Sequence, residues 1–209
     1  MITGSVGFST HLTARRIACQ KAPLAWRVGN FLRHRLLDLP RLWAARLARL
    51  MGATVITSEL RIKVRKQTGE WIDYGLVSTR VVTTVGVNYL VDAWQNSVEL
   101  EIMKYHGAGT TNTAEDIGDT TLAAECTTTL NPDSTRATGT LTEGGGANVL
   151  RSVGTLTFDG NASVVEHGIF NQAATGGGTL WDRSVFGVIT VVSGDSIQFT
   201  YDCTIAAGS

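Results

Sequence analysis

From Val55 onward, the chain alternates apolar and polar residues along short segments that are separated by glycine-rich turns. In 60–65 the residues Leu, Ile and Val alternate with Arg, Lys and Arg, and in 197–205 apolar residues occupy every second position. Successive side chains of a β-strand point to opposite faces, so this alternation predicts strands with one buried face. Short strands separated by turn residues are typical of an antiparallel sandwich or a jelly roll. We therefore predict a mainly β fold, an antiparallel β-sandwich or jelly-roll-like domain.

The predicted strands fall between clear turn signals, among them Gly144-Gly145-Gly146 and Gly176-Gly177-Gly178. A hairpin over 55–84 is followed by strands at about 98–106, 122–130, 135–142, 148–158, 163–171, 179–191 and 196–205. Residues 86–96 differ, because Val87, Leu90, Val91 and Trp94 recur at helical spacing and predict one short helix that packs on a sheet. Residues 107–121 are polar and predict an exposed loop.

Charge divides the chain into two parts near Met51. The chain has 18 basic and 18 acidic residues, but residues 1–50 hold nine basic residues and a single acid, Asp38. The first part is therefore basic and the second is acidic by the same amount. We predict a basic amphipathic N-terminal arm over 1–50 and a β-sandwich domain over 51–209.

Within the arm, apolar residues at three- and four-residue spacing predict an amphipathic helix over 24–50 that is interrupted at Pro40. Four interpretations remain open. It is a transit peptide, a membrane-surface helix, a docking arm for an acidic protein or nucleic acid, or upstream sequence before a start at Met51. The docking interpretation assigns partner binding to basic and aromatic side chains of this segment, namely Arg33, Arg35, Arg41, Trp43, Arg46 and Arg49.

No catalytic motif of the common nucleotide-binding, zinc-protease or serine-hydrolase kinds occurs in the sequence, so we predict a protein that is not an enzyme and has no cofactor or metal. Glu166 and His167 are adjacent on a predicted strand and should point to opposite faces. His106 and His167 could meet across strands, and we expect core histidines there. The acids Glu115, Asp116, Asp119 and Glu125 predict a solvated loop.

Several short motifs follow one another between residues 80 and 205. They include Gly86-Val87-Asn88-Tyr89-Leu90-Val91-Asp92-Ala93, Lys104-Tyr105-His106-Gly107-Ala108-Gly109-Thr110-Thr111, Glu166-His167-Gly168-Ile169-Phe170 and Gly178-Thr179-Leu180-Trp181-Asp182-Arg183-Ser184-Val185-Phe186. In this order the chain resembles β-rich virion structural proteins of tailed bacteriophages, a group found among head-decoration and tail components. The resemblance implies that the glutamate before Gly-Ile-Phe lies on a central strand. The basic arm departs from the pattern of that group.

These observations together favour a non-enzymatic structural protein of a tailed phage particle, a capsid decoration or cement protein that bridges capsid subunits. One alternative is a tail, baseplate or fibre-attachment component. A second is a module that binds host-surface carbohydrate through Trp71 or Trp181. We expect a virion location and other virion proteins as partners, the major capsid protein first. We also expect a homo-oligomer, with a trimer as one candidate, and neither a small-molecule substrate nor nucleic acid as a partner.

Overall fold

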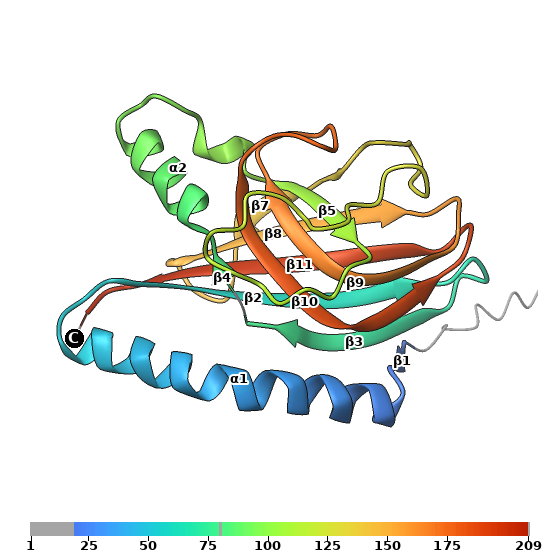
Figure 1. Cartoon of the computed structure of the whole chain (residues 1–209), viewed down its shortest axis with the longest axis horizontal. Coiled ribbons are helices and arrows are strands. Elements are labelled where there is room, and N and C mark those ends of the chain that lie inside the picture. Colours follow the sequence, from blue (N-terminus) through green and yellow to red (C-terminus); the bar gives the residue numbers. More distant parts are fainter. Residues whose placement is uncertain (1–18, 80, 209) are drawn as a thin grey trace, which may run out of the picture.

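A computed structural model describes residues 19–79 and 81–208, without the side chains of 34–39, 41, 42 and 81. Two β-sheets face each other, one long helix runs beneath them, and a short helix lies at one end (Figure 1). The prediction of a mainly β, sandwich-like domain preceded by a partly helical arm is confirmed. Both sheets are antiparallel except where the short first strand pairs parallel to its neighbour.

The first sheet has six strands in the order β1-β3-β2-β11-β8-β7. Their bounds are β1 (Gln20–Lys21), β2 (Val55–Arg65), β3 (Trp71–Ser78), β7 (Thr140–Glu143), β8 (Val149–Thr157) and β11 (Ser196–Ala206). Strand β11 pairs along its length with β2, from Ser196 opposite Arg65 to Ala206 opposite Val55. The predicted hairpin is present as β2 and β3.

The second sheet has five strands in the order β4-β10-β9-β5-β6. Their bounds are β4 (Val81–Val82), β5 (Tyr105–Gly109), β6 (Ala137–Thr138), β9 (Ala162–Phe170) and β10 (Leu180–Val191). Strand β9, which carries Glu166, is the central strand of this sheet, as the phage resemblance implied. Between Val185 and Ile189, β10 shifts its register against β9 and leaves a bulge.

The core lies between the two sheets. Alternate residues of β2 and β8 are buried, whereas β9 and the first half of β10 are buried at consecutive positions. Ile62 on β2, Phe199 on β11 and Val164 on β9 are fully buried and belong to one apolar cluster. The alternation seen in the sequence therefore selects the inner faces of the strands, as expected.

Helix α1 (Leu24–Leu50) is continuous, and Pro40 lies inside it, so the predicted interruption is wrong. A proline inside a helix costs about 3 kcal/mol relative to alanine. Two anchors offset that cost: contacts of the first half with the sandwich, described below, and a C-terminal cap. At the cap Gly52 adopts a φ of 84°, and the Ala53 N–H donates to the Ala48 carbonyl in a Schellman arrangement.

Helix α2 (Thr84–Trp94) confirms the predicted short helix, but it buries a different face. Gly86, Tyr89 and Leu90 are buried, whereas Val87, Val91 and Trp94 are 40%, 42% and 76% exposed. Gly86 determines this orientation, because a Cβ there would lie 2.6 Å from the Trp181 carbonyl oxygen. The helix backbone approaches β10 more closely than any larger residue allows.

Two predicted strands are wrong in part or in full. Residues 98–106 form a 3-10 turn, η1 (Leu100–Ile102), before β5 begins at Tyr105. Residues 122–130 form no strand; Leu122, Cys126 and Leu130 are buried at a spacing of four instead of two. The predicted loop 107–121 begins later than expected, since residues 107–109 belong to β5. The predicted strand 135–142 is divided into β6 and β7.

Candidate functional site

Buried arginine–carboxylate pairs attach the long loop of residues 110–136 to the second sheet. Arg183 on β10 donates to Glu166 on β9 at 2.7 Å and to Asp119 in the loop at 2.9 Å. The Arg183 and Glu166 side chains are 1% and 0% exposed. Glu166 also accepts the backbone N–H groups of Ala123 and Ala124. All charges in this cluster have partners, so we infer that the cluster has a structural role and holds the loop on the second sheet.

A second pair repeats this design nearby. Arg136 donates to both carboxylate oxygens of Glu125, at 2.6 and 3.0 Å, and its guanidinium lies 3.4 Å from the centre of the Phe170 ring. It also donates to the carbonyls of Gln172 and Gly177. The predicted solvated acids are therefore wrong for Asp119 and Glu125, which pair with arginines. Sequence spacing gave no sign of these arginine partners.

The two histidines meet in the core, as the strand register suggested. Nδ1 of His106 lies 3.0 Å from Nε2 of His167, and Nε2 of His106 lies 2.8 Å from the Ser152 hydroxyl. Burial lowers the pKa of His106 to about 3 and lowers the pKa of His167 in the same direction, so both rings are neutral near pH 7. Both side chains are fully buried, and they contact only the interior of the domain. Glu166 points to the opposite face, as predicted for adjacent strand residues.

Asp182 lies in a buried polar cluster formed by side chains of β2, β10 and β11. Its carboxylate accepts hydrogen bonds from Ser58 at 2.7 Å, Ser184 at 3.2 Å and Tyr201 at 3.3 Å. Burial raises its pKa to about 7, against the lowering effect of these donors. The Tyr201 hydroxyl in turn accepts the Trp181 indole N–H at 2.8 Å. The polar groups of this cluster therefore satisfy one another.

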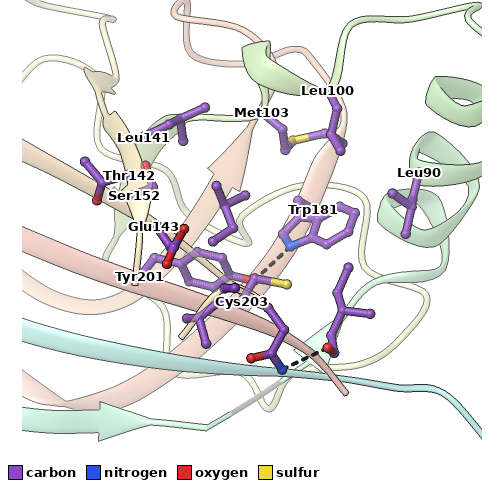
Figure 2. A pocket seen from close by; sticks show the side chains of 15 residues that line it. Leu90, Leu100, Met103, Leu141, Thr142, Glu143, Ser152, Trp181, Tyr201 and Cys203 are labelled. Carbon is purple, nitrogen blue, oxygen red and sulfur yellow. Dashed lines mark hydrogen bonds between the residues drawn. The ribbon is translucent and has the colours of Figure 1, made fainter. Parts of the chain in front are cut away.

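Above this cluster lies a pocket of about 550 Å³, a size typical of ligand and anchor-residue pockets. Figure 2 shows Leu90 of α2 on one side, Leu141 and Glu143 of β7 on the other, and Trp181 and Tyr201 between them. The lining is mostly apolar and comes from α2, η1 and strands β7, β8, β10 and β11. It comprises Leu90, Leu100, Met103, Leu141, Thr142, Glu143, Ala147, Asn148, Val149, Leu150, Ser152, Trp181, Tyr201, Cys203 and Ile205.

The buried polar groups of the pocket are bonded within the chain. The Trp181 N–H and the Tyr201 hydroxyl bond to each other, and the Ser152 hydroxyl bonds to His106. Leu100, Leu150 and Ile205 at the rim are 38–42% exposed. The pocket therefore suits apolar side chains. Trp181 is only 6% exposed and does not present its ring face as the sugar-binding hypothesis requires.

The first half of α1 is attached to the sandwich of its own chain. The Trp26 indole N–H donates to the Val188 carbonyl, and the Arg33 guanidinium donates to the Phe186 carbonyl. The buried Asn30 donates to the Val77 carbonyl of β3 and accepts the Gly187 N–H. These bonds satisfy backbone groups at the β10 bulge and join the two sheets along an open edge. Arg33, predicted to bind a partner, thus has a partner within the chain.

The second half of α1 exposes an apolar face beside basic residues. Trp43, Leu47 and Leu50 are 64%, 57% and 66% exposed, and Arg46 and Arg49 are exposed with them. Arg49 also donates to the Ala207 carbonyl at 3.4 Å. Arg35 and Arg41 lie on the same helix, with side chains outside the described residues. The predicted set is therefore divided between an intramolecular contact and an exposed helix face.

Among the described residues, no group of three or more His, Cys, Asp or Glu side chains is placed to hold a metal ion. No described helix has the length and apolar character that crossing a bilayer requires. Compared with protein-family models, curated proteins and solved structures, the chain gave no match. The pocket is the feature that the sequence analysis missed. Of the predicted α2 stripe, Leu90 alone lines the pocket, and the sequence pattern assigned it to the core.

Proposed function

We propose that the chain is a structural protein of a tailed phage particle, of the capsid decoration or cement kind, that binds neighbouring subunits through exposed helical surfaces. The observation that carries this proposal is the second half of α1, where Trp43, Leu47 and Leu50 stand exposed beside Arg46. Exposed apolar side chains gathered on one helix face are typical of surfaces that a partner covers.

The arrangement of the ionisable groups supports an assembly role. The buried arginines and carboxylates named above bond to one another and to loop backbone, and so stabilise the long loop on the sheet. Leaving one partner of such a pair unpaired is costly, so these groups serve the rigidity of the domain. A rigid domain with an attached helix is suited to bridging subunits.

The resemblance over residues 80–205 is the basis for proposing a tailed phage particle. The basic charge of residues 1–50 is the basis for proposing that the arm attaches the protein to an acidic surface. A basic helix favours acidic protein surfaces, and its contribution weakens at raised salt. Repetition over many sites lets a modest single contact hold the protein on a particle.

The first experiment measures the number of copies per purified particle by quantitative mass spectrometry, with peptides from residues 1–50 scored separately. Hundreds of copies support a decoration protein. A few dozen or fewer would assign the chain to the tail or baseplate, and its absence from particles would refute the proposal.

The second experiment tests the arm. The triple variant Arg41→Gln, Arg46→Gln and Arg49→Gln is expected to dissociate from particles at lower salt than the wild type, because three cations are lost from the contact. The matched control removes three exposed cations from β2 by Arg61→Gln, Lys63→Gln and Arg65→Gln. Equal retention of the arm variant and the wild type would contradict the role of the arm.

A further inference from the structure

Two apolar features lie at the same end of the molecule. Figure 1 shows the C-terminal end of α1 and helix α2 both at the left of the view, with α1 below the sheets beside the C-terminus of the chain and α2 above them. The pocket is also at this end, since α2, η1 and the end of β11 line it. The exposed apolar face of the helix and the pocket with its apolar lining therefore lie toward the same end of the molecule.

The helix of one chain does not enter the pocket of the same chain. Trp26 and Asn30 hold α1 against β3 and the β10 bulge, and β3 lies near one edge of the first sheet. The first-sheet strands that line the pocket are β11, β8 and β7, which lie toward the opposite edge of that sheet. An α1 helix that occupies the pocket therefore comes from another molecule.

The exposed face of α1 has the chemistry that the pocket requires. Trp43, Leu47 and Leu50 follow one another at spacings of four and three, so they lie along one face of the helix. Trp43 is the natural anchor, because a large aromatic ring set into a pocket is the commonest kind of interface hot spot. The pocket offers apolar walls, and its buried polar groups are already bonded within the chain.

The charges of the two surfaces are complementary. Glu143 is part of the pocket lining, and Glu99 and Glu101 flank the rim residue Leu100; all three are exposed. The helix presents Arg46 between its apolar residues, within an arm that holds nine basic residues and one acid. The acidic rim therefore favours a basic amphipathic helix over a neutral or acidic one.

We propose that the second half of α1 binds in the pocket of a second copy of this chain. Because the helix and the pocket lie at the same end, a two-fold axis lets each copy insert its helix into the other, which doubles the contact. This inference goes beyond the proposed function and does not rest on it, because it concerns the purified chain alone. Both proposals use the same helix face, so a copy whose α1 is bound in this pocket does not offer that face to another virion protein.

The test is the oligomeric state of the purified full chain by sedimentation equilibrium, over a range of concentrations up to about 100 µM. The wild type is expected to form dimers that weaken with salt. Trp43→Ala is expected to raise the dissociation constant at least about tenfold. The matched control is Leu32→Ala, which removes an apolar side chain of similar exposure (52%) from the first half of the same helix, and should leave association unchanged.

A charge-exchange experiment identifies which surfaces meet. One variant reverses the helix charge by Arg46→Glu, and the other reverses the rim by Glu101→Lys and Glu143→Lys. Each variant alone brings like charges together and is expected to associate more weakly than the wild type. An equimolar mixture brings opposite charges together at both contacts and is expected to restore association.

A wild type that stays monomeric, a Trp43→Ala variant that associates normally, or a mixture that fails to recover would each overturn this inference. Circular dichroism and thermal unfolding of every variant verify that it is folded. The particle copy number does not enter this test, so its failure is distinguishable from failure of the proposed function.

Discussion

Two separate buried groups, His106 and Asp182, lead to a quantitative prediction about how stability depends on pH. Burial lowers the pKa of His106 from 6.5 to about 3 and raises the pKa of Asp182 from 3.8 to about 7. Both groups are therefore neutral in the folded protein over a pH range in which the unfolded chain carries the charge. As the pH rises, the two groups change the free energy of unfolding in opposite directions.

For His106, the unfolded chain binds a proton below pH 6.5, whereas the folded protein does so only near pH 3. The stabilising effect is complete above pH 6.5 and is lost as the pH falls, at about 1.4 kcal/mol per pH unit and about 5 kcal/mol in total. For Asp182, the folded protein keeps a proton between pH 3.8 and 7 that the unfolded chain has released. Its contribution therefore falls as the pH rises through this window, with the same slope and a total of about 4 kcal/mol.

The perturbation is a pair of variants, His106→Gln and Asp182→Asn, each of which removes one titrating group. Urea unfolding followed by tryptophan fluorescence gives the free energy of unfolding between pH 4.5 and 6.5. Relative to the wild type, the stability of His106→Gln should rise less steeply with pH, by about 1.4 kcal/mol per unit, and that of Asp182→Asn more steeply by the same amount.

The slopes are independent of the constant cost of each substitution, such as the lost bond to Ser152 in His106→Gln. Curves parallel to the wild type for both variants would refute the reasoning, because they would mean that neither group titrates differently in the folded and unfolded states. Slopes that change in the same direction for both variants would contradict the assigned protonation states.

Two further predictions concern packing and charge. Gly86→Ala places a Cβ 2.6 Å from the Trp181 carbonyl oxygen and should lower the free energy of unfolding by about 1–3 kcal/mol in urea titrations. The control Gly145→Ala, with open space around its Cβ, should change this free energy by less than about 0.5 kcal/mol. Equal effects of the two variants would contradict the close approach of α2 to β10. Arg183→Met leaves the buried Glu166 without its cation and should lower the free energy of unfolding by about 3–5 kcal/mol in the same assay. Adding Glu166→Gln to this variant should recover part of the lost stability. No recovery would show that the charge on Glu166 is not the cause of the loss.

The fold class was predictable because its signal is local. The alternation in β11 is regular, and β8, β9, β10 and β11 lie between glycine-containing turns, so their bounds agree with the prediction within a few residues. The segments 98–106 and 122–130 were wrong because their alternation was short. Contacts with α2 and with the Glu166 carboxylate determine their backbone instead.

The candidate site was predictable only in part. Trp43 and Arg46 are exposed on a basic amphipathic helix, and their assignment to partner binding stays a prediction. Arg33 was assigned to the same partner surface, but it donates to the β10 bulge of its own chain. Its helical position was visible in the sequence, whereas the strand beside it was not.

The sequence by itself determined the β-rich domain, the basic arm and the contrast of charge between them, because alternation, turn residues and charge are properties of neighbouring residues. Only the tertiary structure decided which arginines pair with which carboxylates, which face of α2 is buried, and that an apolar pocket opens between α2 and the strands β7, β8 and β11. Those features join residues far apart in the chain, such as Arg33 with Phe186 and Ser58 with Asp182. Their contacts depend on how the two sheets are layered, which no local pattern specifies.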